Sequence, residues 1–514
     1  MNVNKILASA RLISWSYRVI SSLVGLVCLR LINDGIGASG YGELAFVLAY
    51  IGGVCAIDLG FLQSIPRFVS QYSRPQLCSR RGIFWASCLL FISGLLVIQV
   101  VLLALILPAK GNINQFHSFS SIEILALGVT MITGNLLSAF SAILRGRQQY
   151  GRAGIAKIAN SLCYLVAVIL LSSFHDVTVK SVLWSYALAT LIPNLILAIA
   201  LITHDASVMQ LRWEGFPIHH FKQLGNLVKY SLYGWLFTAT TILISSGTIF
   251  GAGLILPSDS VAFLQISIAL YTGVAAFVTG GMSPLTTIKS RLEDSSPDSA
   301  QKIAFTAHHI LQECVVITAI ILGFFVHHLN LLLSILLGTT AQDPFHFHQI
   351  FLLVAVVLFP GLFILPWFTF RFALVSLAES RRYSIKVFTF SALALLIALL
   401  ITILAKNPMP IAICVALILV YRSLLAYQMG SSVLPGLSRL SIILPLTIAF
   451  GACIGINLFI SVVLFRFSHN HSTYDYLHAL LYMVAAVLIY ILRDRLLPKI
   501  QFRSHIFTAA DSRP

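Results

Sequence analysis

Long apolar stretches separated by short polar gaps recur along the whole chain. We interpret about fourteen of them as membrane spans, because about 20 apolar residues in helical conformation cross a hydrocarbon layer about 30 Å thick. The stretches lack the alternation of apolar and polar positions that is typical of membrane β-strands. A helix satisfies its own backbone hydrogen bonds in hydrocarbon. The pattern therefore predicts an all-α, polytopic membrane protein.

The predicted spans divide into two groups of six, followed by two more. We predict an N-terminal six-helix lobe at 1–203, a cytoplasmic linker at 204–229, a C-terminal six-helix lobe at 230–429, and two additional helices with a cytoplasmic tail at 430–514. The similar order of elements in the two lobes indicates parallel repeats with a substrate path between them. The predicted spans are 12–33, 41–65, 83–107, 122–144, 155–173, 181–203, 230–256, 261–286, 304–327, 350–377, 387–405, 411–429, 441–465 and 477–493.

The Lys and Arg residues between the spans fall mainly into every second gap. The other gaps hold only Lys110, Lys180, Lys406 and Arg466. The positive-inside rule then predicts a multi-pass protein of the cell inner (cytoplasmic) membrane with both termini cytoplasmic. Composition agrees, because 58% hydrophobic residues and 10% charged residues leave too little polar surface for a soluble protein of this length.

The formal net charge of +16 follows largely from this topology and from contact with anionic lipids of the inner leaflet. We expect no nucleic-acid binding, because the chain has no basic soluble domain to carry it.

Motifs for catalysis or metal binding are missing from the sequence. There is no Walker A, G-x-S-x-G or HExxH pattern, so we expect neither enzymatic activity nor a cofactor. Histidine pairs occur in the predicted outer loops, but a metal site needs three or four convergent ligands. We interpret them as solvated loop residues: His327, His328, His346, His348, His469 and His471.

Two arginines of the first predicted span are candidates for a functional site. A charge inside a span costs about 2.5–3.5 kcal/mol on insertion scales and usually faces a cavity or a partner. Arg18 and Arg30 can meet a substrate at two depths of one cavity. Alternatively, Arg18 extends to the inner interface and Arg30 to the outer one, where Asp34 or Glu43 pairs with it.

The other charges within the predicted spans admit similar alternatives. Asp58 needs a partner and serves either in an ion pair with a first-span Arg or as a coupling site. Glu313 follows His308 by about one helical turn, and such a pair can carry protons inside a membrane. The structural alternative is a paired acid with His308 at the inner interface. Arg371 and Arg422 lie near inner boundaries, so we expect both to extend to the interface.

Three segments near the N-terminus carry a family resemblance: GASGYGELA at 37–45, IDLGF at 57–61 and PR at 66–67. Together with LRGRQQY at 144–150, they resemble the signature of polysaccharide-lipid flippases (Wzx-like, O-antigen type) of the multidrug/oligosaccharidyl-lipid/polysaccharide exporter superfamily. The specific resemblance covers about 150 residues; the rest of the chain is similar in hydropathy and span number. About fourteen spans resemble the lipid II flippases of that superfamily more than the twelve-span O-antigen flippases, so the glycan stays open.

The resemblance implies two six-helix lobes around a cavity that moves a polyprenyl-pyrophosphate-linked oligosaccharide to the outer leaflet by alternating access. A guanidinium offers fixed, bidentate donors to a pyrophosphate, so Arg18 and Arg30 are the candidate substrate-binding residues. The implied partners are the polyprenyl-pyrophosphate-linked glycan, membrane lipids, and glycosyltransferases or a polymerase of the same pathway.

Two other functions fit the sequence. A drug or organic-cation antiporter of the same fold needs an acidic cavity, with Asp58 and Glu313 accessible. A non-transporting scaffold of a glycan-synthesis complex needs no charged cavity. Arginines outnumber acids within the predicted spans, and this favours the flippase.

Overall fold

The computed structural model describes most of the apolar stretches. The described residues are 3–55, 65, 92–97, 99–100, 121–146, 149–174, 177–204, 231–232, 235–236, 238–279, 297–338, 344–368, 370, 377–430, 440–465 and 471–496. Within these ranges the chain is almost entirely helical and contains no strand. The protein is thus a polytopic all-α membrane protein, as the apolar pattern predicts.

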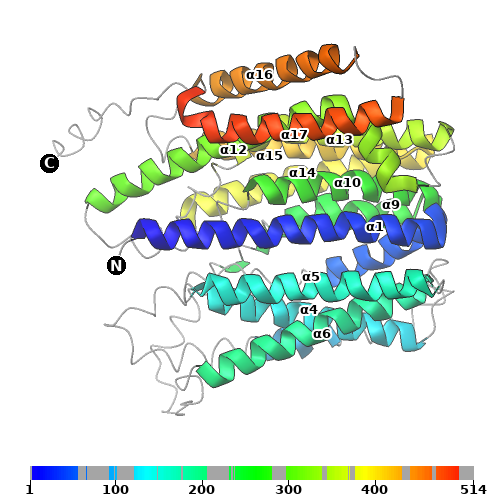
Figure 1. The fold of residues 1–514 in the computed structure, drawn as a ribbon. Helices are drawn as coiled ribbons and strands as arrows, with labels where there is room; N and C mark the ends of the chain where they lie inside the picture. Colours follow the sequence, from blue (N-terminus) through cyan, green and yellow to red (C-terminus); the bar gives the residue numbers. More distant parts are fainter. Residues whose placement is uncertain are drawn as a thin grey trace.

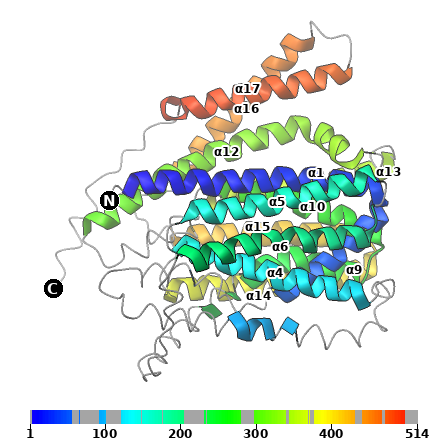
Figure 2. The same cartoon turned by 60° about the horizontal axis from the view of Figure 1, so that its bottom comes forward.

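The N-terminal helix α1 (Val3–Cys55) contains two spans joined at a sharp turn. Gly37 has φ 71° and ψ 177°, a backbone conformation that glycine adopts without steric cost. Figures 1 and 2 show α1 running along the bundle from the N-terminus and turning back at the far end. Both arms of α1 therefore lie inside the bundle.

Three helices pack with α1 to form the N-terminal group: α4 (Ser121–Gly146), α5 (Tyr150–Ser173) and α6 (Val179–His204). Between α4 and α6, the hydroxyls of Thr133 and Thr190 share a hydrogen bond of 2.8 Å. Asn194 Nδ2 donates to the carbonyls of Thr133 and Thr190. Such polar contacts hold apolar helices together where lipid gives no hydrophobic drive for association.

The C-terminal group begins with the π-helical turn η4 (Leu243–Gly247) and α9 (Thr248–Gly253). It continues with α10 (Ser258–Thr279), α12 (Pro297–Leu337), α13 (Pro344–Phe368), α14 (Leu377–Ala405) and α15 (Met409–Gly430). Both α12 and α13 start with proline, whose fixed φ suits the first helical position. The predicted linker 204–229 lies outside the described residues apart from His204, so the lobe boundaries stay predictions.

The last two helices, α16 (Leu440–Phe465) and α17 (His471–Leu496), pack on α12 at the edge of the bundle (Figures 1 and 2). A small core of Val316, Cys453, Ile460, Tyr482 and Ala486 joins them to it. They extend the C-terminal group on one side only.

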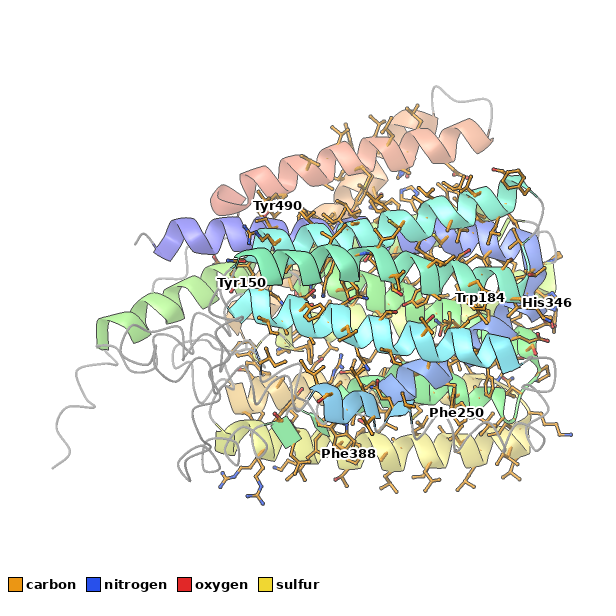
Figure 3. All side chains as sticks on the ribbon, turned by 90° about the horizontal axis from the view of Figure 1, so that it is seen from below. Tyr150, Trp184, Phe250, His346, Phe388 and Tyr490 are labelled. Atoms are coloured by element: carbon orange, nitrogen blue, oxygen red, sulfur yellow. The ribbon has the colours of Figure 1, made fainter. Side chains whose placement is uncertain are left out.

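The outer faces of the helices are apolar, as contact with lipid tails requires. Seven of the described helical segments are long and apolar enough to cross a membrane. Figure 3 shows side chains standing outward from α14. The exposed apolar residues of that helix include Leu393, Leu396, Ile397, Leu400, Ile401 and Leu404.

Several helices end at other positions than the predicted spans, and two of these differences concern the histidine pairs. Helix α12 continues for ten residues past the predicted end at 327 and stops at Leu337. The adjacent His327 and His328 lower the local hydropathy, but the apolar residues after them continue the helix. Helix α13 lies at Pro344–Phe368, whereas the predicted span was 350–377. His346 and His348 accordingly lie in the first turns of α13 and not in a loop.

Helix α1 lies between the two groups, and the main described contacts between them run through it (Figure 1). Its first arm packs on α10, where the ring centroids of Trp15 and Phe277 are 4.8 Å apart. Its second arm packs on η4 and α9, where Phe46 stacks on Phe250 at 5.2 Å. A Cβ atom on Gly42 would collide with the backbone carbonyl of Ser258. Glycine at position 42 therefore sets how closely the groups approach.

We predict that Gly42→Ala lowers the thermal stability of the full chain in detergent. Overpacking against a backbone atom costs about 1–3 kcal/mol, and this exceeds the gain of about 1 kcal/mol from replacing a helical glycine by alanine. The matched control is Gly53→Ala in the same helix, where an added Cβ has no neighbour within 4 Å. Equal thermal unfolding midpoints for the two variants would contradict the close approach at Gly42.

Candidate anion-binding site

Arg18 connects the N-terminal group to the C-terminal group. Its Nε donates a hydrogen bond of 3.2 Å to the hydroxyl of Tyr17 on the same helix. Its Nη1 donates to the carbonyl of Ala276 on α10, 3.3 Å away. The guanidinium is half-buried and lies on the seam between α1 and α10.

Two more cations approach Tyr17 from neighbouring helices. Lys157 Nζ, on α5, lies 5.1 Å from the centroid of the Tyr17 ring. Arg145 lies at the end of α4, where its Nε donates to the carbonyl of Ser141 at 3.3 Å. The charged groups that act on Lys157 are Tyr17, Arg145 and Arg18. Three helices of the N-terminal group thus bring three cations around one aromatic ring.

The cations of this basic cluster, defined as Arg18, Arg145 and Lys157, repel one another. Within the described ranges, no carboxylate forms an ion pair with any of the three. An anion bound among them would relieve this repulsion and accept their hydrogen bonds. The basic cluster is therefore a candidate anion-binding site.

Small polar side chains continue the seam one turn further along α1. The hydroxyls of Ser21 and Ser161 share a hydrogen bond of 2.8 Å between α1 and α5. Ser22 Oγ donates to the carbonyl of Gly273 on α10 at 3.4 Å. Beside the basic cluster, α1 thus presents hydroxyl groups to both groups of helices.

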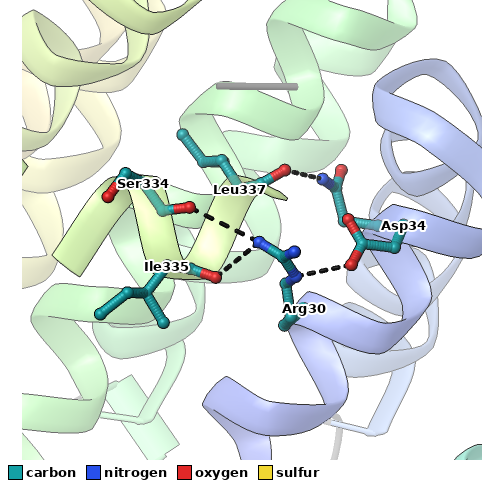
Figure 4. A network of polar contacts seen from close by, with 6 residues as sticks. Arg30, Asp34, Ser334, Ile335 and Leu337 are labelled. Atoms are coloured by element: carbon teal, nitrogen blue, oxygen red, sulfur yellow. Dashed lines mark hydrogen bonds and ion pairs between the residues drawn. The ribbon is translucent and has the colours of Figure 1, made fainter. Parts of the chain in front are cut away.

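Arg30, the second candidate of the first span, lies twelve residues further along α1 and has defined partners there (Figure 4). It forms an ion pair with Asp34, and its Nη1 donates to the carbonyl of Ile335 at 2.7 Å and of Ser334 at 3.5 Å. Asn33 Nδ2 donates to the carbonyl of Leu337 at 3.1 Å. We call these contacts between α1 and the end of α12 the outer clamp.

The outer clamp satisfies the end of a helix. The last carbonyls of a helix have no partner within it, and a cation near them is favourable. Gly338 follows α12 with φ 55°, a left-handed conformation that commonly ends helices. Arg30 is therefore arranged as in the alternative that pairs it with Asp34, and it lies apart from the basic cluster.

The remaining candidates fall in different places. Glu313 is buried in α12, next to Cys314, whose Sγ donates to the carbonyl of Val278 on α10. His308 lies in the same helix, one turn earlier. Asp58 and Arg371 lie outside the described residues. None of these groups belongs to the basic cluster as far as the structure describes them.

The expectation that Arg422 extends to the interface is wrong. Its side chain on α15 is buried, with 6% exposed, and its Cζ lies 4.1 Å from the centroid of the Phe368 ring. The ring face of Phe368 interacts favourably with the guanidinium. The residue points into the C-terminal group because α13 and α15 pack closely there.

The expectation of solvated loop histidines is also wrong for His328. His327 and His328 both lie within α12 and not in a loop; His327 is exposed there, but His328 is buried against α17. The packing of α17 on α12 covers His328, and sequence hydropathy contains no information on that contact.

Solved structures with a similar fold are membrane transporters. An outward-facing multidrug resistance MATE family transporter of the MOP superfamily superposes with a TM-score of 0.63 at 12% identity, covering 84% of this chain and 98% of that one. The lipid II flippase MurJ, in an inward closed conformation, gives 0.61 at 11% identity, covering 94% and 99%. The chain has the fold of MATE transporters and MurJ.

A third neighbour is a MOP superfamily transporter from Pyrococcus furiosus, described by the reverse polarity of its binding pocket (TM-score 0.61, 12% identity, covering 84% of this chain and 98% of that one). No protein-family model matches the sequence, and no curated protein sequence matches it either. At these identities the likeness establishes the MATE/MurJ fold alone.

Within the MATE/MurJ fold of this chain, sequence reasoning missed Arg145 and Lys157. The charge pattern groups both with the basic residues of the gap between the fourth and fifth predicted spans, so it predicts only a role in topology for them. One signal was present: Lys157 lies inside the predicted span 155–173. The contact with Tyr17 depends on the packing of α5 on α1, which the pattern of one segment does not contain.

We predict that sodium pyrophosphate raises the unfolding temperature of the full chain and that Lys157→Gln removes most of this increase. The variant loses one of the three charges that would hold the anion. The matched control is Arg152→Gln, an exposed cation on the same helix that bonds only to Gln149 in the described contacts. If both variants respond to pyrophosphate like the wild type, no anion binds at the basic cluster.

The outer clamp generates a separate prediction. Arg30→Gln should destabilise the chain by about 1 kcal/mol, because the lost bonds are charge-assisted but a third exposed. Double electron–electron resonance between labels at the exposed positions Ser39 and Asn330 should show a broader distance distribution in this variant. The control is Lys406→Gln, which removes an exposed cation far from α1 in sequence. An unchanged distribution and stability would show that Arg30 does not hold α12.

Proposed function

We propose that this protein is a transporter that moves a lipid carrying an anionic pyrophosphate head group, linked to an oligosaccharide, across the membrane. The observation that carries the proposal is the basic cluster, whose cations lie on α1, α4 and α5 beside α10, with no carboxylate paired to it in the described ranges. A pyrophosphate supplies the charge that this cluster lacks.

The chemistry of the cluster suits that head group. Arg18 and Arg145 offer planar, fixed donors to phosphate oxygens, and Lys157 supplies a compact charge. Ser21 and Ser22 add neutral donors further along α1. A polar route for the head group spares it the cost of entering hydrocarbon, while the lipid tail stays in the bilayer.

The size of the match with MurJ gives further support. The match with MurJ covers 94% of this chain, and the match with the MATE structure covers 84%. The difference, a tenth of the chain, is similar in length to α16 and α17 together. The neighbour with a reversed pocket polarity indicates that charge distinguishes members of this fold. By its charge, the seam of this chain favours an anionic substrate.

The remaining parts of the proposal follow from the sequence pattern. We place the protein in the cell inner membrane with both termini cytoplasmic, so that the basic cluster at the cytoplasmic end of the first span meets the substrate where it is made. The substrate is a polysaccharide or O-antigen repeat unit on a polyprenyl carrier. Glycosyltransferases or a polymerase of the same pathway are the expected partners, and the transporter needs no cofactor and has no enzymatic activity.

A second candidate function is a drug or organic-cation antiporter. The buried carboxyl of Glu313 in α12 favours it, because a buried acid can bind a cation or a proton. It predicts dependence on Glu313 and independence from Arg18.

The decisive experiment measures translocation of a fluorescent polyprenyl-pyrophosphate oligosaccharide by the full chain in liposomes. Arg18→Gln should slow translocation by about 10–100-fold, because a bond to a charged group contributes about 1.5–3 kcal/mol. Arg382→Gln, which removes an exposed cation of α14, should keep the wild-type rate.

The same liposomes separate the alternatives. If the wild-type protein takes up an organic cation such as ethidium but does not translocate the lipid, and Glu313→Gln abolishes this uptake, the protein is an antiporter. If the wild-type protein translocates neither compound, the transporter proposal fails and the scaffold interpretation is favoured.

A further inference from the structure

Two histidines meet where α17 packs on α12. His478 Nδ1 and His328 Nε2 are 3.0 Å apart, and both side chains are buried, with 3% and 5% exposed. The contact lies apart from the basic cluster, on the side of α12 covered by the last two helices. Neither the anion site nor the outer clamp uses this imidazole pair.

The third helix of this junction fixes the orientation of His478. Its Nε2 lies 3.1 Å from the carbonyl of Asn457 and 2.8 Å from Ser461 Oγ, both on α16. Asn457 Nδ2 in turn donates to the carbonyl of Gly323 on α12 at 3.3 Å. Tyr482, one turn after His478 on α17, donates to the carbonyl of Ile320 at 2.7 Å. Polar bonds thus tie α16 and α17 to α12 around the imidazole pair.

These partners determine where the hydrogens lie. A backbone carbonyl only accepts, so Nε2 of His478 carries a hydrogen that it donates to Asn457. In the neutral pair, Nδ1 of His478 then accepts from the Nε2 hydrogen of His328. Each ring has one N–H, and the bond between the rings has one donor and one acceptor.

One additional proton fits this arrangement and two do not. A proton that adds to Nδ1 of His328 makes this ring an imidazolium, and its Nε2 hydrogen still donates to His478. The bond becomes charge-assisted and therefore stronger. A second proton would place hydrogens on both facing nitrogens and two like charges about 3 Å apart, which breaks the bond.

We propose that His328 and His478 form a binding site for a single proton, at which the last two helices are attached to α12. The occupied and empty sites have the same ring contact but differ by one positive charge inside the junction. The site is independent of the transported substrate and therefore of the proposed function.

The surroundings of the imidazole pair contain a route for protons and few other titratable groups. His327, the neighbour on α12, is exposed, and its ring centroid is 6.3 Å from that of His478, so it can relay a proton to the pair. Among the described residues, the other titratable groups of the junction are Cys453 on α16 and Tyr482 and Tyr490 on α17. Asp475 is exposed one turn before His478 on α17.

The other helices packed on α12 contribute charged groups at positions other than the imidazole pair. Helix α1 contributes Arg30 and Asp34, which contact α12 at the outer clamp, two turns beyond His328. Helix α13 contributes His346, whose ring packs against Phe263 on α10. A proton at the imidazole pair therefore changes the charge of α12 between the outer clamp and the last two helices.

The test is ¹⁵N solid-state NMR of the full chain, labelled at histidine and reconstituted in phosphatidylcholine vesicles. The direct sign of the pair is a ¹⁵N–¹⁵N coupling across the N–H···N bond, which needs no variant. We expect this coupling at pH 8 and at pH 4. The nitrogens of the pair should show no charge at pH 8 and one shared charge at pH 4.

Variants assign the signals. His328→Gln and His478→Gln should each remove the coupling, whereas His348→Gln, which removes an exposed imidazole of α13, should keep it. In the wild type, the pair should carry one proton at pH 4. Two charges on the pair at pH 4, no charge at pH 4, or no coupling at either pH would each overturn the single-proton site.

Discussion

Helix α1 packs against α5 on one side and against α10 on the other, and its second arm packs on η4 and α9. The main described contacts between the two groups of helices pass through these surfaces. Close approach is possible because Gly42 has no side chain at the carbonyl of Ser258, and because Gly37 lets the chain turn back. The position of every other helix relative to the opposite group depends on this packing.

The same packing decides which charges are compensated. Arg30 faces the end of α12, where Asp34 and helix carbonyls accept its hydrogens. Arg18 faces α10 but shares its surroundings with Arg145 and Lys157, and its acceptors among the described residues are neutral. Two arginines on one helix thus differ in role: one closes a contact between helices, and the other leaves positive charge that an anionic ligand can neutralise.

Several buried polar groups elsewhere bond to backbone carbonyls, which lowers the cost of placing them in hydrocarbon. The amide of Asn194 bonds to backbone carbonyls of α4 and α6, and the amide of Asn457 bonds to α12. The imidazole pair also consists of buried polar groups that bond to each other, and in addition it can accept a proton. Attachment of α16 and α17 through polar bonds, next to a small apolar core, differs from the broad apolar packing of α13 with α15.

The apolar runs by themselves determined the all-α membrane fold, because a hydrocarbon layer admits helices of a certain length and little else. They also marked Arg18 and Arg30 as unusual, since a charge within an apolar run is visible in one dimension. Only the tertiary structure decided that Arg30 pairs with Asp34, that Lys157 and Arg145 meet Tyr17, and that His328 is buried against His478. These outcomes depend on which face of one helix meets another helix distant in sequence, and hydropathy along a single segment does not contain that contact.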